Sequence, residues 1–153
     1  MSKNIAQKLM GIQSNLKAPK GQTNKFGGYK YRSAEDIVEA VKPLLSKYGA
    51  TLMLSDTVVE VGGRVYVKAT AKLGDTDMDD CIETFAFARE AEVKKGMDEA
   101  QITGSASSYA RKYALNGLLC IDDTKDPDAT NDHGKKSKPV ARKPRITEES
   151  FNL

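Results

Sequence analysis

Strict alternation of apolar and polar residues marks the stretch Arg64-Val65-Tyr66-Val67-Lys68-Ala69-Thr70-Ala71-Lys72. A period of two is typical of a strand that buries one of its faces. Residues 52–61, which precede this stretch, are rich in the residue types that favour strands. Between the two segments, Gly62-Gly63 suits a two-residue hairpin turn. The sequence therefore predicts an antiparallel pair of strands here.

A third strand is predicted directly after this pair. The acidic stretch Asp75–Asp80 forms the next turn, and Cys81–Arg89 has the composition of a strand, with Phe85 and Phe87 on one face. Strands that follow one another through short turns pair with their neighbours in the chain. The three segments therefore predict an antiparallel β-meander.

Two helices are predicted before the strands. Asn4–Leu16 carries apolar residues at helical spacing, and a second helix begins at Ser33, with Asp36 in the capping-box position. Gly49 ends the second helix, and Pro43 inside it should bend it. Residues 18–32 between the two helices contain a proline and three glycines and have no period. We therefore expect a loop there.

A third helix follows the strands, with Asp98 as its cap and Gln101 in the answering position. One face of it is predicted to hold Ile102, Ala106, Tyr109, Tyr113 and Gly117, and the opposite side Gly104, Ser107, Ser108 and Arg111. The predicted fold class is thus α+β: a three-stranded antiparallel β-meander with packed helices, in a β-β-β-α core, followed by a disordered C-terminal tail.

The length of 153 residues predicts one domain and a tail. Apolar residues nearly vanish after residue 121, so we expect a domain over residues 1–121 and a disordered charged tail over 122–153. No apolar run reaches the length of about 18 residues that a membrane span needs. Cys81 and Cys120 lack metal-type spacing and are interpreted as two buried thiols. These features predict a soluble, cytoplasmic protein.

The net charge of +3 hides a strong segregation of charge. Residues 1–34 contain no acidic residue and seven basic ones: Lys3, Lys8, Lys17, Lys20, Lys25, Lys30 and Arg32. Of these, Lys3 and Lys8 are expected on the polar face of the first helix. A surface patch of one sign can steer a polyanion, so the segregation indicates an anionic partner.

The loop Lys25-Phe26-Gly27-Gly28-Tyr29-Lys30-Tyr31-Arg32 mixes aromatic rings, glycines and cations. Single-stranded nucleic acid is bound by this combination, because cations follow the phosphates while exposed bases stack on aromatic faces. The alternative is that Phe26 and Tyr29 pack on the core and the lysines are solvated. The residues alone leave both interpretations open.

The third helix is a second candidate for this contact. Gly104, Ser107 and Ser108 would let another backbone approach closely, and Arg111 and Lys112 lie beside them. The alternative is ordinary packing of a helix on a sheet. We expect a groove lined by the Lys25–Arg32 loop and the Arg111 face of this helix.

Catalytic motifs are largely missing from the sequence. There is no P-loop, His133 is the only histidine, and Asp75–Asp80 lacks the glycine and glutamate of an EF-hand. Four aspartates at the start of the tail (Asp122, Asp123, Asp126 and Asp128) could hold a divalent ion of a metal-dependent nuclease. Solvated charge is the simpler interpretation of them, so we expect no enzyme, no cofactor and no metal site.

Three stretches stand out by their order and spacing over about residues 1–128. The first is Phe26-Gly27-Gly28-Tyr29-Lys30-Tyr31-Arg32-Ser33 with the helix start Glu35-Asp36-Ile37, then Val41-Lys42-Pro43-Leu44-Leu45 and Tyr48-Gly49. The others are Gln101-Ile102-Thr103-Gly104-Ser105-Ala106-Ser107-Ser108-Tyr109-Ala110-Arg111-Lys112-Tyr113-Ala114-Leu115 and the exit Asp122-Asp123 with Asp126-Pro127-Asp128. Together they resemble the Erf (essential recombination function) family of phage single-strand annealing proteins.

This resemblance implies a domain that assembles into rings or filaments of identical subunits and binds single-stranded DNA without sequence preference. It also implies annealing of complementary strands during phage recombination, without ATP, in the cytoplasm of a bacterial host cell. The expected DNA-binding residues are Lys25, Phe26, Tyr29, Lys30, Tyr31, Arg32, Ser107, Ser108, Arg111 and Lys112.

Three other functions remain open at this stage. The first is a protein that only protects single-stranded DNA during replication, and the second is the metal-dependent nuclease. The third is an interaction protein that recruits host or phage replication and recombination proteins through its C-terminal tail, with the tip Glu148–Leu153. No membrane partner is expected.

Overall fold

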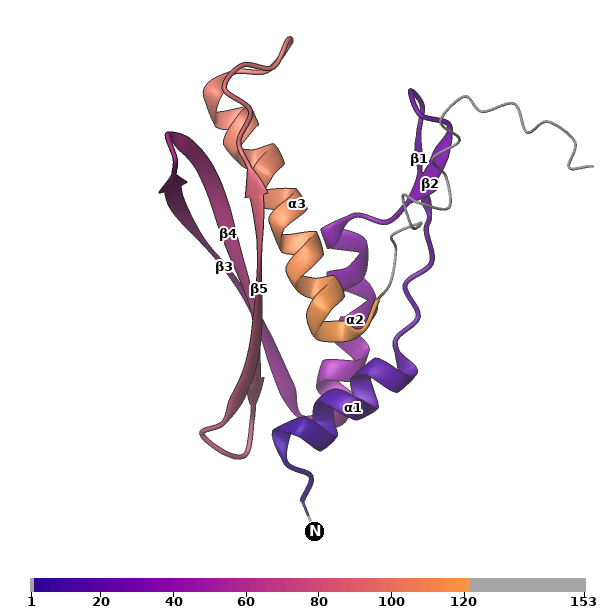
Figure 1. The fold of residues 1–153 in the computed structure, drawn as a ribbon. Helices are drawn as coiled ribbons and strands as arrows, with labels where there is room; N and C mark the ends of the chain where they lie inside the picture. Colours follow the sequence, from indigo (N-terminus) through magenta and orange to yellow (C-terminus); the bar gives the residue numbers. More distant parts are fainter. Residues whose placement is uncertain (1, 122–153) are drawn as a thin grey trace, which may run out of the picture. The chain divides into compact units, whose positions relative to one another are not determined.

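The computed structural model describes residues 2–121 of the chain, and Figure 1 traces their path. The elements in this part are α1 (Ile5–Asn15), β1 (Gln22–Asn24), β2 (Tyr29–Tyr31), α2 (Ala34–Tyr48), β3 (Ala50–Val61), β4 (Arg64–Asp75), β5 (Cys81–Arg89) and α3 (Glu99–Leu119). Strands β3, β4 and β5 form one antiparallel sheet in that order. The predicted meander and the α+β class are confirmed.

The turn between β3 and β4 has the conformation that its two glycines favour. Gly62 and Gly63 have φ values of 60° and 74°. A two-residue turn of type I′ needs positive φ at both central positions, which glycine adopts without a steric penalty. In the resulting register, Val67 of β4 lies opposite Val58 of β3 and Ala88 of β5.

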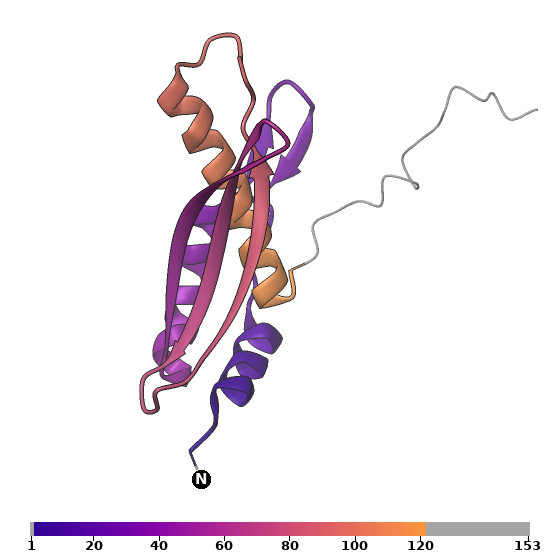
Figure 2. The same ribbon diagram turned by 60° about the vertical axis from the view of Figure 1, so that its left-hand side comes forward.

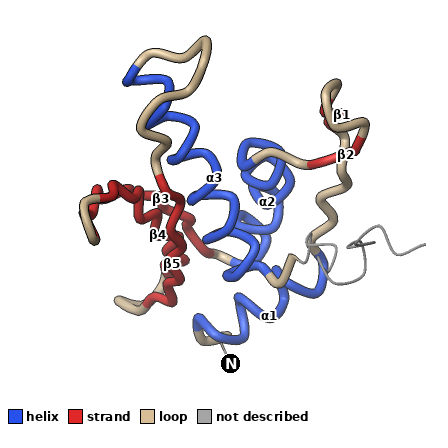
Figure 3. Tube along the Cα trace, turned by 45° about the horizontal axis from the view of Figure 1, so that its top comes forward, coloured by secondary structure: helices blue, strands red, loops and turns tan. Residues whose placement is uncertain are grey.

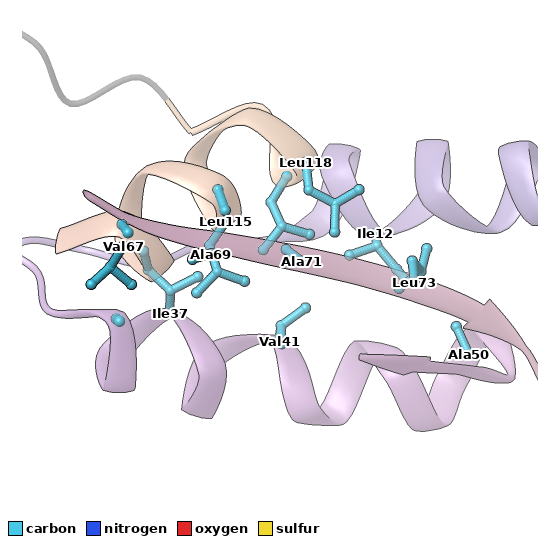
Figure 4. Packing of buried hydrophobic residues seen from close by; sticks show 14 of the residues in the cluster. Ile12, Ile37, Val41, Ala50, Val67, Ala69, Ala71, Leu73, Leu115 and Leu118 are labelled. Carbon is cyan, nitrogen blue, oxygen red and sulfur yellow. The ribbon is translucent and has the colours of Figure 1, made fainter. Parts of the chain in front are cut away.

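The three helices cover one face of this sheet, as Figures 1 and 3 show. The residues of β4 that point toward the helices are at most 1% exposed: Val67, Ala69, Ala71 and Leu73. Figure 4 shows the side chains of this strand packed with Ile37 and Val41 of α2 and with Leu115 and Leu118 of α3. The opposite face of the sheet leaves Phe85 and Phe87 substantially exposed.

Helix α3 is buried along a different line from the one predicted. Ile102 and Ala106 are buried as expected, but Tyr109 and Tyr113 are 52% and 47% exposed. The buried positions of the helix are Ile102, Ala106, Ala110, Ala114, Leu115, Leu118 and Leu119. The alanines let the helix approach the sheet closely, and the larger tyrosine rings lie outside this contact.

All three helices begin with a capping box. Asn4, Ser33 and Asp98 accept hydrogen bonds from the backbone three residues on, and the side chains of Gln7, Asp36 and Gln101 accept the reciprocal ones. The predicted caps of α2 and α3 are therefore confirmed. Helix α2 runs from Ala34 to Tyr48 with Pro43 inside it and ends at Gly49, whose φ is 67°.

The predicted loop before α2 contains a small hairpin, so that prediction was wrong for residues 22–24 and 29–31. Strands β1 and β2 pair antiparallel, with Gln22 opposite Tyr31 and Asn24 opposite Tyr29. The Asn24 carboxamide accepts hydrogen bonds from the backbone of Phe26 (2.9 Å) and Gly27 (3.0 Å), which fixes the turn. Strands of three residues are too short to produce a recognisable period in the sequence.

Both cysteines are exposed, so their predicted burial was also wrong. Cys81 is the first residue of β5, and Cys120 is the C-cap of α3 with a φ of 56°. The ends of elements lie outside the packed layers, which explains their exposure. In residues 2–121 no helix is long and apolar enough to cross a membrane.

Lys8 of α1 corrects another expectation, because it is buried rather than on the polar face of the helix. The residue is 3% exposed. Its ammonium group donates hydrogen bonds to Asp75 Oδ1 (2.7 Å), Asp77 Oδ2 (2.9 Å) and the carbonyl oxygen of Gly49 (3.0 Å). The contact ties α1 to the end of α2 and to the turn between β4 and β5.

This contact shifts the pKa of both partners. The hydrogen bond from Lys8 is the main reason why the pKa of Asp75 lies below its ordinary value of 3.8. The hydrogen bond to Asp75, followed by that to Asp77, raises the pKa of Lys8 above 10.5. The stabilisation from Asp75 is therefore complete above pH 3.8 and is lost as the pH falls through the lowered pKa. The stabilisation from Lys8 is complete below pH 10.5 and is lost as the pH rises through the raised pKa of Lys8.

We predict that Lys8→Met lowers the Tm by several degrees, because it leaves the buried Asp75 carboxylate without its counter-charge. Lys42→Met is the matched control, since Lys42 pairs with Glu39 on the surface, where both side chains are more than half exposed. An exposed pair contributes less than about 1 kcal/mol. Thermal unfolding followed by circular dichroism measures the Tm of both variants. Equal decreases in Tm for Lys8→Met and Lys42→Met would contradict the prediction.

The pH dependence gives a separate prediction for Asp75→Asn. The variant should be less stable than the unchanged chain at neutral pH, and the difference should narrow as the pH falls below 3.8. Urea unfolding at a series of pH values measures it. A difference that stays constant down to the lowest pH would show that the charge of Asp75 contributes nothing.

Candidate functional site

The β1–β2 hairpin presents aromatic rings close to its base and its tip. Tyr29 and Tyr31 pack edge to face, with ring centroids 6.4 Å apart, and the Tyr29 hydroxyl accepts a hydrogen bond from Asn24 Nδ2 (2.9 Å). Tyr29 is 53% exposed, and Phe26 at the turn is fully exposed. The alternative in which Phe26 and Tyr29 pack on the core is therefore wrong.

A hollow of about 350 Å³ separates this hairpin from α3 and from the start of α2. Figures 1 and 2 both show the hairpin near the end of the sheet where α2 begins. We call this space the hairpin hollow. Its lining residues are Asn24, Tyr29, Tyr31, Arg32, Ser33, Ala34, Glu35, Ser105, Ser108, Tyr109 and Lys112.

Cations and rings meet in the hairpin hollow. The Lys112 ammonium of α3 lies 5.8 Å from the centroid of the Tyr31 ring, a distance at which cation and ring attract. Arg32 adds a second cation from the hairpin, and Tyr109 adds a third ring from α3. One acidic residue, Glu35, also lines the hollow. The arrangement can hold a planar, anionic ligand.

Half of the ten residues expected at a DNA site lie in this hollow. They are Tyr29, Tyr31, Arg32, Ser108 and Lys112. Lys25, Phe26 and Lys30 are exposed on the hairpin but do not line the hollow. The structure thus brings the predicted loop and the third helix together, through a subset of the expected residues.

Ser107 and Arg111 point to a different neighbour, Asp56 of β3. Arg111 Nε donates to Asp56 Oδ1 (3.0 Å) and Oδ2 (3.2 Å), and Ser107 Oγ donates to Oδ2 (2.5 Å). Partial burial acts to raise the pKa of Asp56, but the hydrogen bonds from Arg111 and Ser107 outweigh it and hold that pKa below its ordinary value. The guanidinium therefore already has an anionic partner within the chain.

Sequence reasoning missed Tyr109, Asn24, Ser105 and Glu35 as parts of the hollow. Tyr109 was assigned to the buried face of α3 instead. A usable signal exists in the spacing, because Ser105, Ser108, Tyr109 and Lys112 recur at three and four residues and so share one face of a helix.

Within residues 2–121, no three acidic, histidine or cysteine side chains gather in a way that could hold a metal ion. The four tail aspartates considered for a nuclease lie outside the described residues, as do the predicted tail and the tip Glu148–Leu153.

Fold and hollow together define a small α+β protein with an aromatic, cationic recess beside its main helix. The chain matches the family model described as the ERF superfamily over residues 5–150. It is also 54% identical over 143 residues to the essential recombination function protein of Salmonella phage P22. The aligned region covers 94% of this chain and 67% of that protein. The chain therefore belongs to the ERF superfamily, as its sequence motifs predicted.

The contact of Arg111 with Asp56 can be tested by a double-mutant cycle. We expect a coupling of about 0.5–1 kcal/mol between Arg111→Ala and Asp56→Ala, because both side chains are partly exposed and solvent screens the pair. Urea unfolding of the two single variants and the double variant measures it. Strictly additive effects would mean that Arg111 is not held by Asp56 in solution.

Proposed function

We propose that this chain binds single-stranded DNA in the hairpin hollow and anneals complementary strands without ATP, in the homologous recombination of a phage or prophage. The observation that carries the proposal is the convergence of three tyrosine rings with the cations Arg32 and Lys112 in one recess. Membership of the ERF superfamily, and the name of the relative from Salmonella phage P22, support a role in recombination.

The chemistry of the hollow suits single strands. Base stacking on an aromatic side chain contributes about 1–3 kcal/mol per base and tolerates any sequence, because every base has a π-face. Tyr29 and Tyr109 are each about half exposed and can take part in stacking. A volume of about 350 Å³ suits a splayed-out base rather than a duplex.

Annealing requires that the bound strand keeps its base-pairing edges accessible. Stacking uses the face of a base, and Lys112 and Arg32 can contact phosphates, so neither interaction consumes a Watson–Crick edge. Assembly of many subunits into a ring or filament would place many such sites along one strand and raise the overall affinity. We assign this activity to residues 1–121 and propose that residues 122–153 form a tail that could contact other recombination or replication proteins.

The direct test follows duplex formation from two labelled complementary strands, without ATP or divalent metal. The protein should accelerate pairing above the spontaneous rate. Binding without acceleration would leave a protein that only protects single strands, and product shortening that depends on magnesium would indicate a nuclease. Either result would contradict annealing.

Two substitutions test the site itself by fluorescence anisotropy with labelled oligothymidylate. Tyr29→Ala should weaken binding by about 5-fold to about 150-fold, the equivalent of one lost stacking partner. Lys112→Ala should reduce the slope of log affinity against log salt by about one unit.

Arg111→Ala is the matched control for Lys112→Ala, since it removes a cation one position away on α3 that pairs with Asp56. It should leave the salt slope nearly unchanged. If Arg111→Ala lowers the slope and Lys112→Ala does not, the strand lies on the β3 side of α3 and the hairpin hollow is not the site.

A further inference from the structure

A second hollow lies on the other side of the same part of α3. It has a volume of about 450 Å³ and opens between α3, the end of β5 and the residues that follow it. Its lining residues include Phe87 and Arg89 of β5, Lys94, and Ile102, Tyr109 and Tyr113 of α3. We call it the sheet-edge hollow. Neither the family resemblance nor the charge pattern pointed to it.

The sheet-edge hollow is lined by exposed aromatic rings. Tyr109 and Tyr113 lie one helical turn apart, with ring centroids 6.2 Å apart and planes inclined by 32°. Tyr113 is 47% exposed although its ring is large and largely apolar. Rings held in this way, half in contact with the protein and half in solvent, provide faces on which a base can stack.

The charge of this hollow has one sign. Arg89 at the end of β5 and Lys94 in the following segment both line it, and none of its described lining residues is acidic. On the outer face of the sheet, the ammonium of Lys68 in β4 lies 4.3 Å from the ring centroid of Phe85 in β5 and 6.0 Å from that of Phe87. Cations thus accompany the rings from the hollow onto the outer face of the sheet.

The two hollows share part of their walls. Ser105 and Tyr109 line both, while Ser108 and Lys112 line only the hairpin hollow and Tyr113 only the sheet-edge hollow. They therefore open on either side of one ridge of α3. The diameter of a helix with its side chains is about 10–12 Å, so a single strand can cross from one hollow to the other.

We propose that the strand bound in the hairpin hollow continues over Tyr109 into the sheet-edge hollow. Tyr113 stacks one of its bases there, and Arg89 and Lys94 contact its phosphates. This inference rests on the proposed function and extends its binding site. The occupant is nucleic acid rather than a second copy of the chain, because the centre of a protein interface is depleted of charged residues whereas this hollow contains two cations and no acid.

The test compares the double variant Arg89→Ala/Tyr113→Ala with the unchanged chain, using oligothymidylates of graded length from about 4 to about 16 nucleotides. Affinity of the unchanged chain should rise with length until both hollows are filled. The variant should bind the shortest oligonucleotides within about 2-fold of the unchanged chain and the longest about 5-fold to about 150-fold more weakly. Its salt slope on the longest should be about one unit smaller.

Controls separate this inference from the proposed function. Lys42→Ala removes an exposed cation that lines neither hollow and should bind every length normally. Thermal unfolding verifies that the double variant is folded. Lys112→Ala should weaken binding at every length. If no oligonucleotide binds the unchanged chain, the proposed function fails. If the strand binds but the double variant keeps its full affinity at every length, the sheet-edge hollow is not part of the path. The same holds if the double variant loses affinity equally at all lengths. A smaller assembly of the double variant in sedimentation would show a second copy there instead and overturn the proposal.

Discussion

The close contact between α3 and the sheet is the constraint on which the other features depend. Ala106, Ala110 and Ala114 of the helix and Ala69 and Ala71 of β4 are all buried in one cluster. Because these side chains end at Cβ, the helix backbone can approach the strands, and Thr84 of β5 donates a hydrogen bond to the carbonyl of Ala114 (2.9 Å). Tyr109, Lys112 and Tyr113 of the helix lie outside this contact and line the two hollows, and Arg111 reaches Asp56.

The acid-free N-terminal segment combines two physical roles that its charge pattern does not distinguish. Lys8 is buried and connects α1 to Asp75, so its charge stabilises the fold. Arg32 lines the hairpin hollow, whereas Lys25 and Lys30 are exposed along the hairpin. A cluster of like charges in a sequence therefore indicates an anionic ligand only for those members that the fold leaves at the surface.

The proposed mechanism needs no chemistry beyond stacking and charge. Ring faces lie next to cations on both sides of the α3 ridge. On one side Tyr31 lies beside Lys112, and on the other Tyr113 lines a hollow with Arg89 and Lys94. Such contacts bind any sequence and leave base edges free, which is the requirement for pairing two strands. Membership of the ERF superfamily is consistent with this assignment, and the hollows give it particular residues.

The sequence by itself determined the β-meander, the helix caps and the family. Each of these is encoded locally: alternation along Arg64–Lys72, paired residues three apart at Ser33 and Asp98, and ordered motifs. It also predicted that the 25–32 segment and the third helix form one DNA-binding site, and their contact with DNA stays a prediction. Only the tertiary structure decided that Lys8 meets Asp75, that Arg111 meets Asp56, and that Tyr109 lies in the hollow rather than the core. The partners of the two cations are 67 and 55 residues away in the chain, and no local period in a sequence records a contact across such distances.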